Sequence, residues 1–240
     1  MGAVRSGSHV IIHGKERMKT RMLVSIVSGL LFAAPTFAVP SWSYFAGGDA
    51  AFQAISNNGT LERAVTEGRI GDNGTNQTWE RAIWQLGGVG VPQTTGQFAW
   101  TSGVPVDFSV VYDGVSTVTY NVGSTTLSWG GMAGPFTDIF IRTRATSTST
   151  LLLSDLDLVG SGLSIGNLSS AGSVDYLRIE NMGMNFGAFE LRGKATLSWT
   201  GPAPTGSALA YQVKLTNVIP DPATIMLVAG GVLTLVRRRR

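Results

Sequence analysis

Apolar and polar residues alternate regularly in the middle of the chain. The run Pro105–Tyr112 (PVDFSVVY) contains alternating Val106, Phe108 and Val110, and the run Val115–Val122 (VSTVTYNV) contains alternating Val118, Tyr120 and Val122. Successive side chains of a β-strand point to opposite faces, so this period of two is typical of strands with one buried face. Asp113-Gly114 lies between the two runs and is typical of a hairpin turn. The pattern predicts an antiparallel hairpin here.

Similar runs recur at roughly ten-residue spacing, separated by Gly, Asn, Asp and Ser. We expect further strands at Thr125–Trp129, Thr137–Ala145, Thr150–Val159, Asp175–Glu180, Ala188–Thr200 and Ala208–Val218. No stretch after Val39 shows sustained helical periodicity. The sequence therefore predicts an all-β fold, a single antiparallel β-sandwich of jelly-roll-like type.

The pattern is less regular before Pro105. We expect an entry strand within Val39–Ser56, a short strand or a helical turn at Leu61–Val65, and a strand at Thr78–Leu86. The glycine-punctuated segments Glu67–Asn76 and Gly87–Gly96 are interpreted as loops.

The two ends of the chain differ from the strand-rich region. Residues 1–17 are polar and without pattern, and we interpret them as an upstream extension without a role. Residues 18–38 combine a basic start, an apolar stretch and small residues before Ala38, which predicts a helical signal peptide cleaved after Ala38. This leaves residues 39–218 as an extracellular domain and 219–240 as a sorting or anchor segment.

The C-terminal segment combines a proline-bounded acid, an apolar run and a basic end. The apolar run Ala223–Val236 is shorter than the roughly 20 residues of a full transmembrane helix, so it predicts a short hydrophobic helix that anchors the chain transiently. Arginines at its end would stay on the cytoplasmic side. The residues that carry this signal are Pro220, Asp221, Pro222, Ala223, Arg237, Arg238, Arg239 and Arg240.

Composition narrows the chemistry of the central domain. The sequence has no cysteine, and its two histidines, His9 and His13, precede the predicted signal peptide. Without His or Cys, the domain lacks the groups of Ser-His-Asp or Cys-His catalysis and of the usual zinc sites. Nine Lys/Arg and thirteen Asp/Glu between Val39 and Ile219 give it a net charge near −4, so the basic ends of the chain do not indicate nucleic-acid binding.

The order of Pro-acid-Pro-Ala, a short apolar run and an arginine cluster from Pro220 to Arg240 resembles the PEP-CTERM sorting signal of Gram-negative bacteria. Asp221 stands where that family usually has Glu, which keeps the carboxylate. The resemblance implies export through the secretion translocon, recognition by exosortase at the inner membrane, and a place at the cell surface or in the exopolysaccharide matrix of a biofilm.

The segments EGRIGDNGTNQTWERAIW, VPVDFSVVYDGVSTVTYNVGSTTLSW, DIFIRTRAT and ATLSWTG resemble the extracellular choice-of-anchor domains, type W, which occur upstream of such tails. This resemblance spans roughly residues 50–218 and brings no catalytic motif. Together the two resemblances favour a non-enzymatic surface or matrix protein.

Two other functions stay open. Tryptophans stack on sugar rings as well as filling cores, and a carbohydrate-binding module would use rings such as those of Trp79, Trp84, Trp100 and Trp129, with Trp199 also available. A glycoside hydrolase would need two carboxylates about 5–9 Å apart. The available acids are Glu67, Glu80, Asp107, Asp138, Glu180 and Glu190, and none of them lies in a motif that we can name.

No cofactor is expected, and calcium is a weak alternative. Asp72, Asn73 and Asn76 offer oxygen ligands of the kind that calcium takes, although turn chemistry explains them without a metal. Asp155 and Asp157 lie two residues apart in a strand and are interpreted as part of a solvated face.

Overall fold

A computed structural model describes the chain at residues 39–56, 61–70, 79–85, 92–132 and 134–218. Contacts between Cα atoms divide the chain into Met1–Thr36 and Phe37–Arg240, and every described residue belongs to the second unit. The predicted signal peptide with its cleavage site at Ala38, and the whole predicted sorting segment, lie outside the described residues. Within the described ranges, no helix is long and apolar enough to cross a bilayer.

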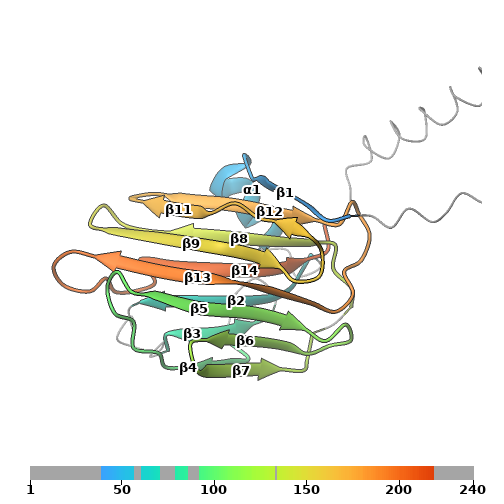
Figure 1. Cartoon of the computed structure of the whole chain (residues 1–240), viewed down its shortest axis with the longest axis horizontal. Helices are drawn as coiled ribbons and strands as arrows, with labels where there is room; N and C mark the ends of the chain where they lie inside the picture. The colour runs from blue at the N-terminus through green and yellow to red at the C-terminus, as the bar shows by residue number, and fades with distance from the viewer. Residues whose placement is uncertain (1–38, 57–60, 71–78, 86–91, 133, 219–240) are drawn as a thin grey trace, which may run out of the picture. The chain divides into compact units, whose positions relative to one another are not determined.

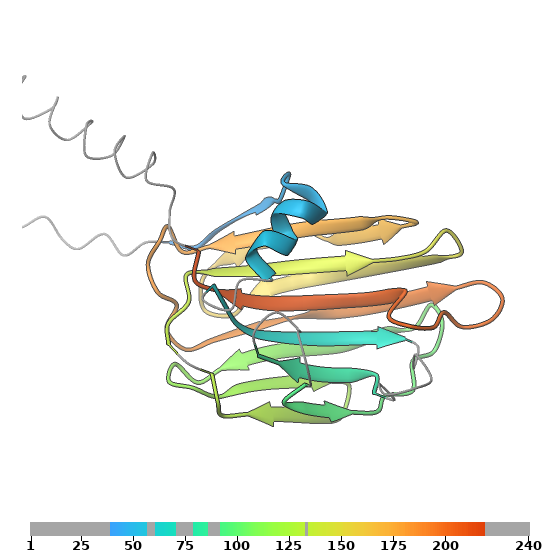
Figure 2. The ribbon, with the colours of Figure 1, turned by 180° about the vertical axis from the view of Figure 1, so that it is seen from behind.

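The described residues form two antiparallel sheets and one helix (Figures 1 and 2). The first sheet contains, in spatial order, β1 (Ser41–Tyr44), β12 (Val174–Glu180), β8 (Asp138–Arg144), β14 (Leu209–Thr216), β2 (Glu62–Ile70), β3 (Arg81–Trp84) and β4 (Thr94–Gly96). The second contains β10 (Leu163–Ser164), β9 (Ser149–Leu158), β13 (Phe189–Trp199), β5 (Pro105–Tyr112), β6 (Val118–Val122) and β7 (Thr125–Trp129), with β11 (Leu168–Ala171) also paired to β9.

One hydrophobic cluster joins the two sheets. Alternate residues of β14, such as Tyr211 and Val213, meet alternate residues of β6 and β13, such as Tyr120 and Leu197. The hydroxyl groups of Tyr120 and Tyr211 are 2.7 Å apart and hydrogen-bonded inside this cluster. Burial raises the pKa of both tyrosines, so the pair stays protonated and the hydrogen bond persists across the physiological pH range.

Strand register defines two ends of the sheets. Ser41, Glu180, Asp138 and Thr216 lie in one row across four neighbouring strands of the first sheet. We call this the Thr216 end; it carries the connections 113–117, 159–162 and 181–188. The opposite end, the Trp199 end, carries the connections 145–148, 172–173 and 200–208. Both ends of the described domain, Val39 and Val218, are therefore at the Thr216 end.

The expectation of an all-β domain without a helix is wrong in the segment Val39–Ser56. The segment predicted as an entry strand holds β1 and then α1 (Gly48–Ser56), which lies over the outer face of the first sheet (Figure 2). Asp49 in the first turn suits the positive end of the helix dipole, and its carboxylate accepts a hydrogen bond from the hydroxyl of Tyr176 in β12. Phe52 packs on Phe140 and Tyr176 and is fully buried, so this short helix is held by tertiary contacts.

The loop predicted at Glu67–Asn76 is also wrong in its first part, because β2 continues to Ile70. Gly68 is a strand residue there. A Cβ atom at this position would lie 2.6 Å from the Tyr120 hydroxyl and 2.6 Å from a ring carbon of Tyr211. The glycine therefore makes room for the tyrosine pair and marks a close approach, not a turn.

The bulge in β9 accounts for the placement of its two aspartates. The register between β13 and β9 changes between Arg192 and Lys194 of β13, and Asp155 of β9 has a positive φ of 54°. The extra residue lets Leu153 and Leu156 both enter the core. Asp155 and Asp157 lie on the outer, solvated face, as predicted. There they pair with Lys194 and Arg192.

Candidate functional site

Two of the four predicted stacking tryptophans are buried. Trp79 and Trp84 are 6% and 5% exposed and pack with Val65 and Ala82 on the outer side of β2 and β3. The guanidinium carbon of Arg69 lies 3.4 Å from the centroid of the Trp79 ring. Neither ring offers a free face to a sugar in this arrangement.

The other two predicted tryptophans are half-buried. Trp100 stacks edge-on with Phe98 and Tyr211, and Trp129 packs against the central cluster at the end of β7. The structure does not gather the four rings into one platform, because Trp79 and Trp84 belong to one hydrophobic cluster and Trp100 and Trp129 pack against another. Trp100 and Trp129 keep partly accessible rings and remain candidates.

A hollow of about 550 Å³ lies at the Trp199 end. Trp199 is half-buried at the end of β13, and its backbone is held by Ser102, whose hydroxyl donates to the Trp199 carbonyl at 3.0 Å and accepts from the Trp199 amide at 2.9 Å. The lining residues are Ser147, Thr148, Ser149, Thr150, Ala171, Gly172, Ser198, Trp199 and Thr200. We call this the Trp199 hollow.

The chemistry of the Trp199 hollow is neutral and rich in hydroxyl groups. None of its lining residues carries a charge. Hydroxyl groups both donate and accept hydrogen bonds, and an indole ring adds an apolar surface. This combination suits an uncharged, hydroxyl-bearing ligand such as a segment of neutral polysaccharide. Sequence reasoning named Trp199 but gave it no priority; the Ser/Thr run from 146 to 150 was the available signal.

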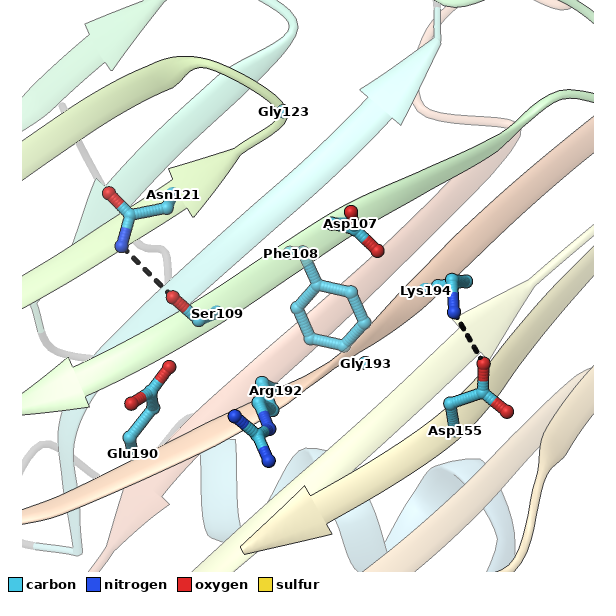
Figure 3. Close-up of a pocket in the computed structure, with 10 residues that line it drawn as sticks. All are labelled: Asp107, Phe108, Ser109, Asn121, Gly123, Asp155, Glu190, Arg192, Gly193 and Lys194. Atoms are coloured by element: carbon cyan, nitrogen blue, oxygen red, sulfur yellow. Dashed lines mark hydrogen bonds and ion pairs between the residues drawn. The ribbon is translucent and has the colours of Figure 1, made fainter. Parts of the chain in front are cut away.

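A second, smaller groove of about 350 Å³ crosses the outer face of β5, β6, β13 and β9 (Figure 3). Asp107, Glu190 and Arg192 line it, with Asn121 donating to the Ser109 hydroxyl at 2.9 Å. Lys194 bridges to Asp155 at 2.7 Å. Most of these charges are already paired across strands, so the groove presents a mixed polar surface.

The predicted acids do not form an accessible pair in the groove. Asp107 lies opposite Lys194, and Glu190 is four residues further along β13, a separation of about 13 Å along the strand. Paired carboxylates of glycoside hydrolases are about 5–9 Å apart. Of the other acids named from sequence, Glu80 is half-buried just before β3 and Glu67 is buried in β2.

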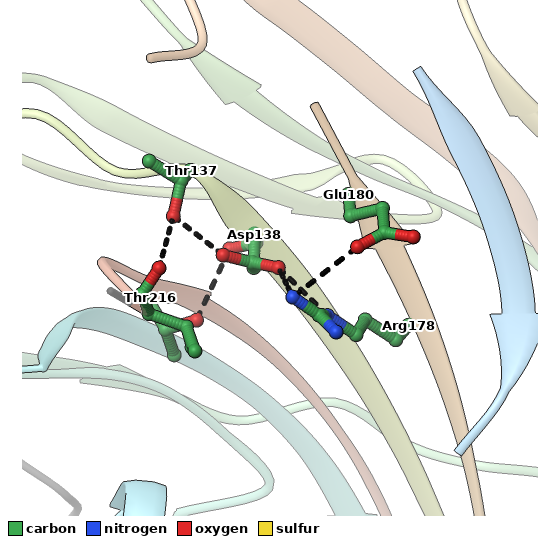
Figure 4. Close-up of polar contacts among 6 residues, drawn as sticks. Thr137, Asp138, Arg178, Glu180 and Thr216 are labelled. Carbon is green, nitrogen blue, oxygen red and sulfur yellow. Dashed lines mark hydrogen bonds and ion pairs between the residues drawn. The ribbon is translucent and has the colours of Figure 1, made fainter. Parts of the chain in front are cut away.

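Asp138 and Glu180 do lie opposite each other, but Arg178 contacts both carboxylates (Figure 4). The Arg178 Nε donates to Asp138 at 2.7 Å, and Asp138 also accepts from the Thr137 hydroxyl. The Thr137 amide donates to the Thr216 carbonyl at 2.9 Å. Asp138 is 2% exposed. This network fastens the last residues of β14 to β8 and β12, at the point where the chain leaves the sheet.

Buried charges cluster on the outer side of the first sheet. The ammonium of Lys214 in β14 pairs with Glu62 of β2 at 2.8 Å, with 5% and 0% of the two side chains exposed. Burial lowers the pKa of Lys214, and the Glu62 carboxylate opposes that change. Burial also raises the pKa of Glu67, against the positive charges of Arg69 and Lys214. These groups have partners within the sheet, which suits a structural role.

No group of three or more His, Cys, Asp or Glu side chains with metal-site spacing occurs among the described residues. The weak calcium candidates Asp72, Asn73 and Asn76 lie outside that part of the chain, as do Pro220, Asp221, Pro222, Ala223 and Arg237 to Arg240.

Comparison with protein-family models gives no match, and comparison with curated proteins gives none either. The resemblance of the tail and of the domain to known families therefore stays a prediction from the sequence.

Proposed function

We propose that this protein is exported from a Gram-negative cell, sorted through its C-terminal tail by exosortase, and displayed at the surface or in the extracellular polysaccharide matrix without acting as an enzyme. The tail sequence from Pro220 to Arg240 motivates the proposal. Its partners would be the translocon, exosortase, the inner membrane during processing, and the matrix polymer.

The observation that supports this proposal best is the row that joins the two ends of the domain. Ser41, three residues after the predicted cleavage site, and Thr216, four residues before Pro220, lie in one row of the first sheet, three strands apart. Strands are about 4.8 Å apart, so their backbones are separated by roughly 14 Å. One end of the domain can therefore face a membrane that holds both terminal segments before processing.

The proposal is tested by following the chain in a host that has the processing enzyme. We expect the mass of the recovered protein to show cleavage after Ala38 and loss or exchange of the tail. Deletion of residues 220–240 should release the chain, and Asp221→Ala should leave the tail unprocessed. Asp221→Glu should behave like the wild type. Unchanged mass and location after the deletion would overturn the proposal.

We also infer that the two sheets form a jelly-roll-like sandwich. Eight strands, taken in chain order as β2, β5, β8, β9, β11, β12, β13 and β14, support this. The first pairs with the last, the second with the seventh, the third with the sixth and the fourth with the fifth. This nested pairing is that of a long hairpin rolled into two sheets, and the remaining strands extend its edges.

A second function, binding of neutral polysaccharide, is favoured by the Trp199 hollow. The hollow joins a partly accessible indole to six hydroxyl-bearing residues without a charge. Trp199→Ala should abolish retention on a neutral polysaccharide and Trp129→Ala should not, if the hollow is the site. Equal retention of both variants would remove the hollow from consideration, and retention of neither the variants nor the wild type would remove the function.

A further inference from the structure

The exposed apolar side chains of the domain are unevenly placed. Among the described residues, eight large hydrophobic side chains are exposed, and five of them lie at the Thr216 end. These five are Val115 (76% exposed), Met182 (72%), Val39 (65%), Met184 (52%) and Val159 (38%). Val104 is the single one at the Trp199 end. We call the five the apolar rim.

The rim comes from separate connections brought together by the fold. Val115 lies in the β5–β6 connection, Val159 in the β9–β10 connection, and Met182 and Met184 in the β12–β13 connection. Backbone hydrogen bonds hold two of these connections against other segments: Val159 N donates to Glu190 O of β13 at 2.9 Å, and Asn181 N donates to Thr137 O, just before β8, at 3.1 Å. The uneven distribution, with five exposed apolar side chains at one end and one at the other, favours the Thr216 end as an interaction surface.

The three connections that carry most of the rim hold little charge. In the connections 113–117, 159–162 and 181–188, Asp113 is the single ionisable residue. Its carboxylate oxygen accepts hydrogen bonds from the amides of Val115, Ser116 and Thr117 at 2.7, 2.8 and 3.0 Å. Backbone amides thus hydrogen-bond the one carboxylate of these connections. The rim can therefore approach a low-dielectric surface without removing water from a carboxylate that has no other hydrogen-bond partner.

We propose that the apolar rim rests on the lipid headgroup and upper acyl region of the membrane that holds the C-terminal tail. This inference rests on the proposed function, because it needs the tail to lie in a bilayer. Six residues separate Thr216 from Ala223, the start of the apolar run. Six residues span at most about 20 Å, so the end of the domain that bears the rim must lie close to that bilayer.

The chain offers a clean test, since it has no cysteine. Single variants Val115→Cys and Met182→Cys of the full chain carry an environment-sensitive fluorophore at the rim, and Ser147→Cys and Thr205→Cys carry it at the Trp199 end. The labelled chains are reconstituted into vesicles of phosphatidylethanolamine and phosphatidylglycerol. We expect a nitroxide-bearing lipid to quench the two rim labels several-fold more than the two control labels.

Three results overturn the inference in distinguishable ways. If the chain does not float with the vesicles, the tail is not a membrane segment, and the proposed function fails as well. If the chain floats but rim and control labels are quenched alike, the rim inference alone fails. If rim labels are shielded in detergent in a concentration-dependent way and not quenched in vesicles, a second copy covers the rim instead of lipid.

A charge variant checks that apolarity is the cause. Val115→Asp combined with Met182→Asp should strongly reduce the quenching of a label at Met184→Cys, because carboxylates resist transfer into the headgroup region. Val104→Asp, at the exposed valine of the opposite end, should leave that quenching unchanged. Equal effects of the two charge changes would contradict the inference.

Discussion

The buried ion pair between Lys214 and Glu62 gives a strong prediction about stability. Lys214→Met removes the ammonium that lies 2.8 Å from the Glu62 carboxylate, and that carboxylate is 0% exposed. Removing one member of a buried pair costs about 3–5 kcal/mol, mainly because the remaining charge is poorly solvated. The Lys214 ammonium also lies 5.0 Å from the Phe52 ring, so α1 should loosen with the pair.

The expected size can be converted to a melting temperature. For a domain of 150–250 residues, 1 kcal/mol shifts the midpoint by about 2–4 °C, so Lys214→Met should lower it by about 6–20 °C. The double variant Lys214→Met with Glu62→Gln should recover most of this loss, because both charges of the pair are then removed.

Thermal unfolding followed by circular dichroism measures both values, and Lys194→Met is the matched control. Lys194 pairs with Asp155 at 2.7 Å, nearly the same distance, but the two side chains are 45% and 66% exposed. Exposed pairs contribute little, so the control should leave the midpoint nearly unchanged. Equal effects of Lys214→Met and Lys194→Met would show that burial does not set the strength of these pairs, and would refute the reasoning.

Three further predictions concern single positions. Gly68→Ala should destabilise the domain by about 1–3 kcal/mol in urea unfolding, because its Cβ would overlap two buried tyrosines; Gly187→Ala, with open space around it, should be neutral. Glu67→Gln should stabilise the domain above pH 4.5 and have no effect well below it. The raised pKa of Glu67 means that the native state holds this proton more tightly than the unfolded state, so wild-type stability falls as pH rises above 4.5. Asp113→Ala should accelerate amide hydrogen exchange at residues 115–117, which lose their common acceptor.

The strands from Pro105 onward could be predicted from the sequence because most of them have one buried and one solvated face. The bounds of β5 and β7 are those predicted, and those of β8, β9, β12, β13 and β14 differ from the prediction by one or two residues. The Asp113-Gly114 signal marks a real hairpin, although its connection runs from Asp113 to Thr117, since Tyr112 pairs with Val118.

Alternation fails where both faces of a strand are covered. In β2, the residues from Ala64 to Ile70 are all buried, because the core lies on one side and a layer containing Trp79 and Trp84 on the other. The charged residues Glu67 and Arg69 therefore suggested a loop in the sequence, although both are buried and have partners in the structure. Helix α1 was missed for a related reason: nine residues with Phe52 as the main buried contact are too few for a helical period.

The candidate sites show a similar limit. Sequence alone names tryptophans but cannot tell which rings are covered, because coverage depends on contacts between different strands and connections. Arg69 over the Trp79 ring and the apposition of Trp199 with residues 147–150 are such contacts. The apolar rim was hidden for the same reason, since its members are spread from Val39 to Met184.

The two ends of the domain have different surface chemistry, and this bears on how display could work. Strand β13 runs from Phe189 near the Thr216 end to Trp199 at the other and has eleven residues, which extend about 36 Å. With the rim on the membrane, the Trp199 hollow would stand roughly that far from the bilayer, beyond the lipid headgroups. In the proposed display, a neutral, hydroxyl-lined surface at that distance would contact extracellular polymer before lipid. An apolar rim placed at that distance would instead expose its side chains to water. The opposite orientation would place the hydroxyl groups against the membrane and is disfavoured by the short link from Thr216 to Ala223.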